Sequence, residues 1–206
     1  MTKYELIIFD CDGVMFDTRW VNRLYYNHLL AHFNLPEMTE EQFEYSHSHS
    51  AFDAVKYLCG PHNIPEKDVI AYLKNINYGD YIKHMIINPE LKPLIESIRP
   101  PCITAIATNR SDTMPKVIEK FDLKPYFDRV MTASDVPNPK PAPEMVLNII
   151  NHFKVDKDKV FYIGDTSVDE QVAIRANITF AAFQNKSLKA DFHINALSEI
   201  KTIISI

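Results

Sequence analysis

The chain has 206 residues, of which 46% are hydrophobic and 24% are charged, and its formal net charge is −5 at pH 7. This composition is that of a globular protein and excludes a disordered chain, while the acidic balance argues against non-specific nucleic-acid binding, which depends on clustered Lys and Arg. Every apolar run is shorter than the roughly 18 residues of a membrane span, so we expect no membrane partner.

A nearly continuous apolar run over residues 4–9 predicts a first strand, over residues 4–10, that is buried on both faces as in a parallel sheet. This strand ends at Asp10, and Asp12 and Gly13 follow it at the edge where open α/β folds bind ligands. Two carboxylates roughly 4 Å apart repel each other by about 4 kcal/mol at an effective dielectric constant near 20. Because a protein keeps such a pair only with a cation or a shared proton to offset the repulsion, the pair predicts a metal site.

Residues 17–88 show helical periodicity and no convincing strand. Apolar residues recur at spacings of 3 and 4 from residue 20 onward, and further helices are expected over 40–45, 51–59 and 66–85. This stretch is too long for one crossover connection, so it predicts a helical insertion at 17–88 into a discontinuous core of residues 1–16 and 89–206. The alternating Ser and His residues at 46–50 are expected to form a solvated loop, with contact to substrate and metal binding through two His as alternatives.

The remainder of the chain alternates between helix and strand. This alternation predicts the α/β class, with a doubly wound, Rossmann-like parallel sheet covered by helices on both faces. The expected strands cover residues 102–108, 129–132, 160–165 and 178–183, and the expected helices cover 89–98, 111–121, 142–153, 168–176 and 196–204.

Two polar segments follow strands in this second part. The strand over 102–108 ends in Thr108 and Asn109, where a hydroxyl and the N–H groups of the following helix could bind a phosphate oxygen, although both residue types are also common as helix caps. Farther on, prolines at every second position stiffen the loop at 136–144 and hold Lys140 at its centre. A solvated surface Lys is the alternative; close to a carboxylate cluster, the ammonium could grip a phosphoryl group.

A second pair of acids follows the strand over 160–165. Gly164 and Asp165 end this strand, and Asp169 comes four residues later. If a helix starts near residue 167, both acids project toward one side of its first turn. Helix capping would explain either acid alone, but not both acids together with the pair at the first strand.

Taken together, these segments resemble the haloacid dehalogenase superfamily in its phosphatase branch, and in particular its phosphoglycolate phosphatase-like members. Four motifs carry the resemblance in order along almost the whole chain: Asp10-Cys11-Asp12-Gly13, Thr108-Asn109, Lys140 in its Pro-rich loop, and Gly164-Asp165 with Asp169. The resemblance implies that the helical insertion is a C1-type cap. It also implies a Mg²⁺-dependent hydrolase that acts on a small phosphorylated metabolite, as a monomer or weak homodimer.

The resemblance also implies a role for each matching residue. Asp10 would be the nucleophile that forms an aspartyl-phosphate, Asp12 the acid and base, and Lys140 the cation that orients Asp10. Oxygen ligands suit Mg²⁺ better than zinc. The implied catalytic residues are Asp10, Asp12, Thr108 and Lys140, the substrate-binding residues are Gly13, Arg19, Asn22 and Asn109, and the metal ligands are Asp10, Asp12, Asp165 and Asp169.

Two other functions remain open at this level. Sugar-phosphate mutases of the same cap type share Asp12 but typically carry a His where this chain has Asn22, which favours hydrolysis. A non-catalytic module that binds a phosphorylated ligand would be expected to have lost the nucleophile or the acid, and both are retained. Cys11, Cys59 and Cys102 lack metal-site spacing, and no signal segment precedes the first strand, so we expect reduced thiols and a cytoplasmic protein.

Overall fold

The computed structural model describes residues 3–76 and 79–204. Six strands form one sheet in the order β5-β4-β1-β6-β7-β8, and all neighbouring strands in it run parallel. The strands are β1 (Leu6–Phe9), β4 (Ile103–Thr108), β5 (Arg129–Thr132), β6 (Val160–Gly164), β7 (Thr179–Phe183) and β8 (Phe192–Ile194). The predicted α/β fold class and its five strands are confirmed, and β8 is an additional edge strand.

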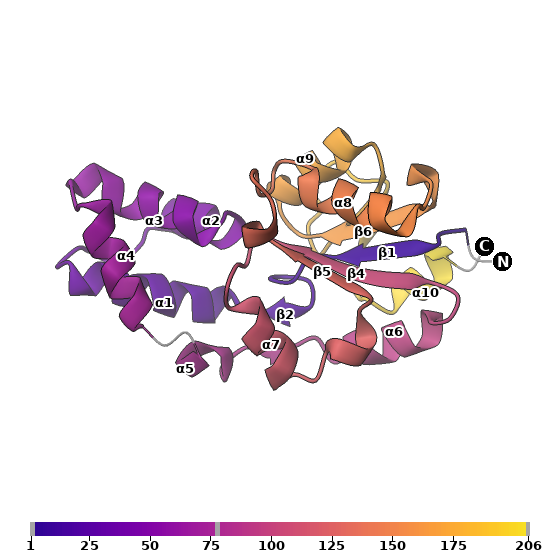
Figure 1. Ribbon diagram of the computed structural model, residues 1–206, viewed down its shortest axis with the longest axis horizontal. Helices are drawn as coiled ribbons and strands as arrows, with labels where there is room; N and C mark the ends of the chain where they lie inside the picture. Colours follow the sequence, from indigo (N-terminus) through magenta and orange to yellow (C-terminus); the bar gives the residue numbers. More distant parts are fainter. Residues whose placement is uncertain (1–2, 77–78, 205–206) are drawn as a thin grey trace.

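Helices cover both faces of this sheet (Figure 1). One face packs against α6 (Leu91–Ile98), α7 (Met114–Lys120) and α10 (Glu199–Ile204), and the other against α8 (Glu144–Phe153) and α9 (Ser167–Ala176). Successive side chains of a strand point to opposite faces. Accordingly, Ile7 and Phe9 belong to the first apolar cluster, and Leu6 and Ile8 belong to the second.

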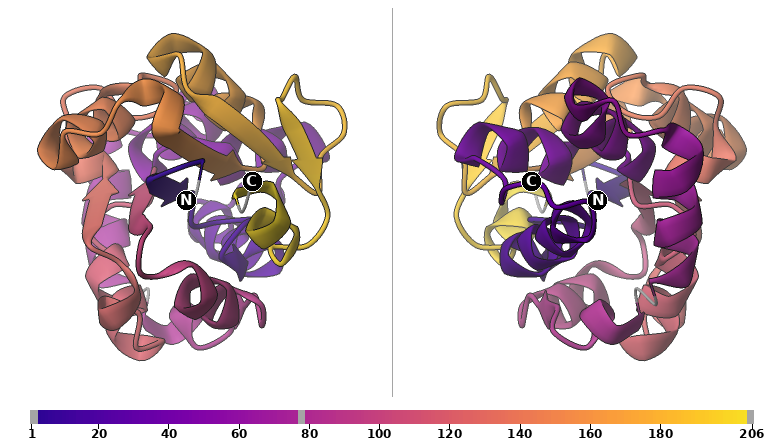
Figure 2. Two further views of the ribbon diagram at one scale, coloured as in Figure 1. Left: turned by 90° about the vertical axis from the view of Figure 1, so that its right-hand side faces the viewer. Right: turned by 90° about the vertical axis from the view of Figure 1, so that its left-hand side faces the viewer.

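The insertion between β1 and β4 is helical, as predicted, and contains its own apolar cluster, which includes Leu29, Phe43 and Leu58. Its helices are α1 (Arg19–His32), α2 (Glu40–Ser48), α3 (Ala51–Cys59), α4 (Glu66–Asn75) and α5 (Gly79–Ile82). These helices lie beyond one end of the sheet in Figure 1 and face the viewer in the right-hand view of Figure 2. Short 3₁₀ turns occur at Gly60–His62, Lys124–Tyr126, Ala133–Asp135 and Lys157–Lys159.

Three expectations for the insertion are wrong, and the first two concern its strands and its fourth predicted helix. A short antiparallel pair, β2 (Phe16–Asp17) and β3 (Ile86–Ile87), joins its two ends, although no strand was expected between residues 17 and 88. The helix expected over 66–85 ends at Asn75, because Ile76 has extended backbone dihedral angles, and α5 begins only at Gly79. Residues 77 and 78 of that expected helix lie outside the described residues.

The segment at 46–50 is not a solvated loop. Helix α2 continues through it to Ser48, and Ser50 caps the next helix by accepting a hydrogen bond from the backbone N–H of Asp53. His47 is buried because it lies one turn after Phe43, on which its ring stacks. The alternation of Ser and His shows no helical periodicity by itself. Phe43 and His47 are four residues apart, however, and residues at this spacing share one face of a helix.

Candidate active site

The three strands at the centre of the sheet bring the sequence motifs to one edge. Phe9 at the end of β1 pairs with Ile106 of β4 on one side and with Ile163 of β6 on the other. Asp10, Thr108 and Asp165 therefore lie at neighbouring strand ends. The chain order reverses at β1, which is where ligands bind in open α/β sheets.

A pocket of about 100 Å³ lies at this edge, between the core and the helical insertion. From the core it is lined by Asp10, Asp12, Thr108, Asn109, Arg110 and Lys140, and from the insertion by Asn22, Tyr25, Tyr26 and residues 46–49. The pocket thus brings together both acids of the first motif, the second motif, Lys140 and Asp169 of the fourth motif.

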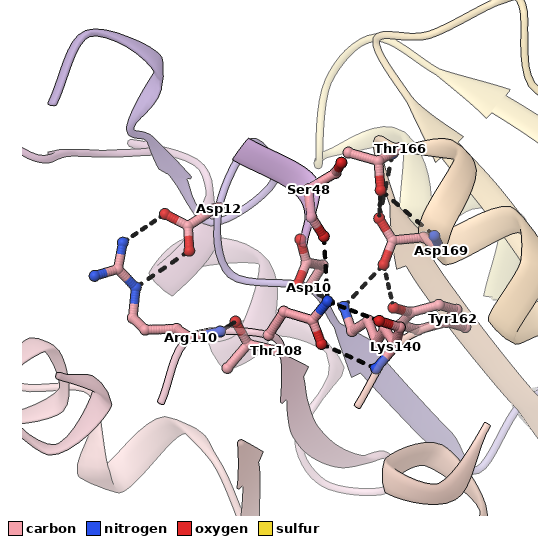
Figure 3. Close-up of polar contacts among 10 residues, drawn as sticks. Asp10, Asp12, Ser48, Thr108, Arg110, Lys140, Tyr162, Thr166 and Asp169 are labelled. Atoms are coloured by element: carbon pink, nitrogen blue, oxygen red, sulfur yellow. Dashed lines mark hydrogen bonds and ion pairs between the residues drawn. The ribbon is translucent and has the colours of Figure 1, made fainter. Parts of the chain in front are cut away.

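Lys140 lies at the centre of a buried ion-pair network (Figure 3). Its Nζ donates to Asp10 Oδ1 at 2.6 Å and to Asp169 Oδ1 at 2.8 Å. Burial lowers the pKa of Lys140, but the two carboxylates outweigh burial and raise it above its ordinary value. Asn109 fixes the Lys140 loop by accepting from its backbone N–H at 2.9 Å and donating to its carbonyl at 3.0 Å. Lys140 is therefore a buried, charged group and not a solvated surface lysine.

Three carboxylates crowd together beside this lysine. One oxygen from each of Asp10, Asp165 and Asp169 lies within 4.8 Å of the others. Burial raises the pKa of Asp10 to about 7 against the opposing effect of Lys140, and burial together with the neighbouring carboxylates raises the pKa of Asp165 well above its usual range. Within residues 3–76 and 79–204, Asp165 Oδ1 has no hydrogen-bond partner.

Gly13 makes room for this cluster. Its φ of +86° is disfavoured for residues with a side chain, and a Cβ there would lie 2.0 Å from Asp165 Oδ2. Glycine thus lets the loop after β1 pass directly against the Asp165 carboxylate. A crowded set of oxygen donors, one of them unpaired, fits a hard divalent cation.

Asp169 differs from the other two acids because its oxygens are already paired. Besides Lys140, its Oδ1 accepts from the Tyr162 hydroxyl, and its Oδ2 accepts from Thr166 through both the backbone N–H and the hydroxyl. Tyr162 was not identified from the sequence. A Tyr hydroxyl inside a buried strand needs a hydrogen-bond partner, and this requirement could have marked Tyr162 as a neighbour of the acid cluster.

Asp12 is turned toward Arg110 and not toward Lys140 (Figure 3). The Arg110 guanidinium donates to both carboxylate oxygens, at 3.1 Å from Nε and 2.6 Å from Nη2. Burial raises the pKa of Asp12, but Arg110 outweighs burial and holds it below its ordinary value. The backbone N–H of Arg110 donates to the Thr108 hydroxyl at 3.1 Å, which links this pair to the end of β4.

The insertion contributes one of the two residues expected from it. Asn22 lies in the pocket wall and contacts His47, which the sequence did not single out. Arg19 does not line this pocket: its guanidinium pairs with Glu44 and Glu40, its side chain is half exposed, and it lines a second cavity of about 820 Å³ together with Gly13 and Asp165.

No helix within the described residues is long and apolar enough to cross a membrane.

A model of the haloacid dehalogenase-like hydrolase family matches residues 7–183 of this chain.

Individual relatives are similar over most of their length. The pyrophosphatase PpaX of Oceanobacillus iheyensis is 22% identical over 96% of this chain and 95% of its own. The phosphoglycolate phosphatase of Haemophilus influenzae is 24% identical over 82% of this chain and 80% of its own. The crystal structure of beta-phosphoglucomutase from Clostridium difficile has the same fold, with a TM-score of 0.86 and 21% identity over 97% of this chain and 95% of its own. The chain belongs to the haloacid dehalogenase-like hydrolase family, as its four ordered motifs predict.

Proposed function

We propose that this protein is a Mg²⁺-dependent phosphomonoester hydrolase that acts on a small phosphorylated metabolite through an aspartyl-phosphate at Asp10. The observation that carries the proposal is the buried contact between the Lys140 ammonium and Asp10, beside two further acids at the edge of the sheet. The similarity to a pyrophosphatase and a phosphoglycolate phosphatase supports hydrolysis of a phosphate ester or anhydride.

In the first step, Asp10 attacks phosphorus. Lys140 holds Oδ1, so the other carboxylate oxygen of Asp10 is the attacking atom. The bond between phosphorus and the ester oxygen breaks as the bond to Asp10 forms, and protonated Asp12 gives its proton to the leaving oxygen. The Thr108 hydroxyl and the Asn109 backbone bind phosphoryl oxygens, and Lys140 neutralises the charge that develops on them.

In the second step, water attacks phosphorus and Asp12 accepts its proton. The bond to Asp10 breaks, which releases phosphate and restores the Asp10 carboxylate and protonated Asp12. Arg110 favours the charged form of Asp12, which suits this step. The first step requires protonated Asp12, so we propose that Asp12 separates from Arg110 when substrate binds.

The acid cluster supports a Mg²⁺ site. We assign Asp10, Asp165 and the Asp12 carbonyl as its ligands, because Asp165 Oδ1 is unpaired within the described residues and burial raises the pKa values of Asp10 and Asp165. The cation supplies charge neutralisation for the reacting phosphoryl group. Asp169 belongs to the same cluster, but its four hydrogen bonds favour a role in holding Lys140, with the cation reached only through water.

Hydrolysis is proposed in preference to phosphoryl transfer between sugar positions. Asn22, which stands where related mutases typically have His, is held in the pocket wall by its contact with His47. The fold shared with beta-phosphoglucomutase does not separate the two reactions. Incubation with glucose 1-phosphate distinguishes them, since a hydrolase releases phosphate and a mutase forms glucose 6-phosphate.

The central test is turnover of p-nitrophenyl phosphate by the wild-type protein and an Asp10→Asn variant, with and without Mg²⁺. We expect Mg²⁺-dependent phosphate release that falls by at least ~10³-fold in the variant, as for other nucleophile replacements. Asp158→Asn, at an exposed position outside the pocket, is the matched control and should keep wild-type turnover. Retained turnover in a folded Asp10→Asn protein, checked by circular dichroism, would refute the assignment of the nucleophile.

A further inference from the structure

His47, near the end of α2, is a buried polar residue in the pocket wall that the two chemical steps do not use. Its side chain is packed on Phe43, with the ring centroids 5.3 Å apart, and the residue is 8% exposed. Asp12 and Asn22 line the same pocket. His47 therefore belongs to the part of the site where the helical insertion faces the reacting carboxylates.

The contact with Asn22 determines which ring nitrogen of His47 carries the proton. The amide nitrogen of Asn22 lies 2.9 Å from His47 Nδ1. An amide nitrogen can only donate, so Nδ1 accepts, and the proton of the neutral ring sits on Nε2. Burial lowers the pKa of His47 against the opposing attraction of Asp12, which favours this neutral form. His47 thus presents an N–H donor at Nε2.

This donor is buried, and it has no hydrogen-bond partner in the described part of the chain. Leaving a buried donor unpaired costs about 1–3 kcal/mol, and nearly all buried polar groups in proteins are paired. A donor retained at this cost beside the reacting groups is explained if an atom of the bound substrate accepts its hydrogen bond.

The charge in the same pocket favours an anionic acceptor. Arg110 is buried there with a side chain only 5% exposed, and Asp12 is its ion-pair partner. An anionic group on the leaving alcohol would be attracted by this guanidinium and could also accept a hydrogen bond from His47. The pocket is about 100 Å³, which favours a small leaving group over a large one.

We propose that His47 Nε2 recognises an oxygen acceptor on the leaving group, a carboxylate or a second phosphoryl group one or two atoms beyond the bridging oxygen. The inference rests on the proposed function, because it presupposes a phosphate ester or anhydride cleaved at Asp10. It adds a specificity-determining residue from the helical insertion and narrows the substrates to small acids that carry a phosphate.

The test compares two nearly isosteric esters, phosphoglycolate and ethyl phosphate, which differ in the presence of the carboxylate. In His47→Phe, which keeps a ring against Phe43 but removes the donor, we expect the ratio of kcat/KM for phosphoglycolate to that for ethyl phosphate to fall at least about tenfold. His47→Gln retains an N–H donor and should keep the ratio within about threefold of wild type. The ratio of kcat/KM for pyrophosphate to that for ethyl phosphate tests a phosphoryl acceptor in the same way.

His32→Phe is the matched control, because His32 is an exposed residue of α1 stacked on Tyr72 and lies outside the pocket lining. A ratio that falls in His47→Phe for either acceptor, and not in His32→Phe, supports the proposal. Ratios unchanged in His47→Phe for both acceptors overturn it. If the wild-type protein hydrolyses none of phosphoglycolate, pyrophosphate, ethyl phosphate and p-nitrophenyl phosphate, the proposed function fails instead.

A measurement on the unmodified ring covers the case in which His47→Phe does not fold. Nitrogen NMR of ¹⁵N-histidine in the Asp10→Asn protein should show His47 protonated at Nε2 and unprotonated at Nδ1. Addition of phosphoglycolate should shift the Nε2 resonance, and ethyl phosphate should shift it much less. Protonation at Nδ1, or equal shifts with both esters, would contradict the proposal.

Discussion

Lys140 is held between two carboxylates that have different tasks. Asp10 has one oxygen on the lysine and one available for chemistry, whereas both oxygens of Asp169 are bonded to protein groups. A carboxylate that is fully paired is a rigid support for the ammonium that it contacts. Asp169 therefore positions Lys140, and Tyr162 and Thr166 position Asp169.

This arrangement predicts the effect of removing the Tyr162 hydroxyl. Tyr162→Phe should lower kcat on p-nitrophenyl phosphate about 5- to 20-fold with little change in KM. A hydrogen bond to a charged group contributes about 1.5–3 kcal/mol, and only part of this loss reaches Lys140 because Asp169 keeps its bonds to Lys140 and Thr166. Tyr126→Phe is the matched control, since it removes a hydroxyl from Glu96 at the surface and should leave kcat unchanged. Equal kcat values for Tyr162→Phe and wild type would rule out this role.

The crowded acids also make stability depend on pH and on the divalent cation. The pKa of Asp10 is raised to about 7 and that of Asp165 well above its ordinary value, by burial and then by neighbouring carboxylates. An acid with a raised folded-state pKa stabilises the fold most below its unfolded pKa, and this contribution is lost as the pH rises through the folded pKa. Without a bound cation, these two residues should therefore destabilise the protein progressively from about pH 4 to above pH 7.

We expect the increase in Tm caused by saturating MgCl₂ to be larger at pH 8.0 than at pH 5.5, by roughly 5 °C or more. His47 has a lowered pKa, so its contribution to stability increases with pH, opposite to that of the two acids. This contribution is the same with and without Mg²⁺, so it cancels when the two Tm values are subtracted. Asp12 and Asp169 have lowered pKa values and lose their stabilisation only at more acidic pH. Asp165→Asn should abolish most of the Mg²⁺ effect, and a Tm increase independent of pH would argue against a cation at these acids. Thermal denaturation followed by circular dichroism measures all four conditions.

At the scale of the elements, the loop after β1 determines how closely Asp165 can approach. Gly13→Ala should lower turnover at least ~100-fold and destabilise the fold by about 1–2 kcal/mol or more, because the left-handed backbone is strained with a side chain and the new methyl group would displace the Asp165 carboxylate. Gly60→Ala is the control: Gly60 is helical, and no described atom lies within 4 Å of the new methyl group. It should keep full turnover and raise stability by up to about 1 kcal/mol. Normal activity of Gly13→Ala would show that the cluster tolerates a wider spacing.

The elements that the sequence predicted well are those with strong local patterns. The five predicted strands are largely apolar runs bounded by polar residues, and α9 ends at Asn177, a residue type that adopts the left-handed conformation readily. Three elements depend on strand pairing more than on a local pattern. β8 is a three-residue edge strand that pairs with β7, and β2 and β3 are two residues each and exist through pairing with one another. No local period indicates such elements.

The same distinction holds for the site. Residues at the ends of strands could be placed from the sequence, because parallel strands end at one edge, and the structure brings Asp10, Thr108 and Asp165 together there. The contact of Arg110 with Asp12 and the burial of His47 depend on how side chains turn and how the insertion packs. Arg19 also depends on such packing, since it pairs with Glu44 of α2 and lines the second cavity with Asp165.

At the scale of the whole molecule, we propose that residues 17–88 form a cap that is structurally separable from the core. The apolar cluster built around Leu29, Phe43 and Leu58 contains no residue of the six-stranded sheet, which lies between the two other clusters. Residues from the two ends of the insertion pack into the first of those clusters: Val21, Tyr81, Ile82 and Met85. In the active site, the core contacts the insertion through a hydrogen bond of 3.2 Å from the Asn109 side chain to the Ser48 carbonyl. Both units line the pocket, so cap movement would control entry of substrate and water.

A cap with its own core should unfold locally before the sheet does. Leu58 is 1% exposed in the cap cluster, and Leu58→Ala should destabilise that unit by about 2–5 kcal/mol. We expect hydrogen exchange of amides in α1–α4 to accelerate at least ~30-fold, with exchange in β1, β4 and β6 nearly unchanged, since local opening has its own free energy. Ile149→Ala in α8 removes a side chain from a cluster that includes sheet residues, so it should accelerate exchange in the sheet instead. If Leu58→Ala accelerates exchange in the sheet as much as in α1–α4, the two units unfold together and the division at residues 17–88 is wrong.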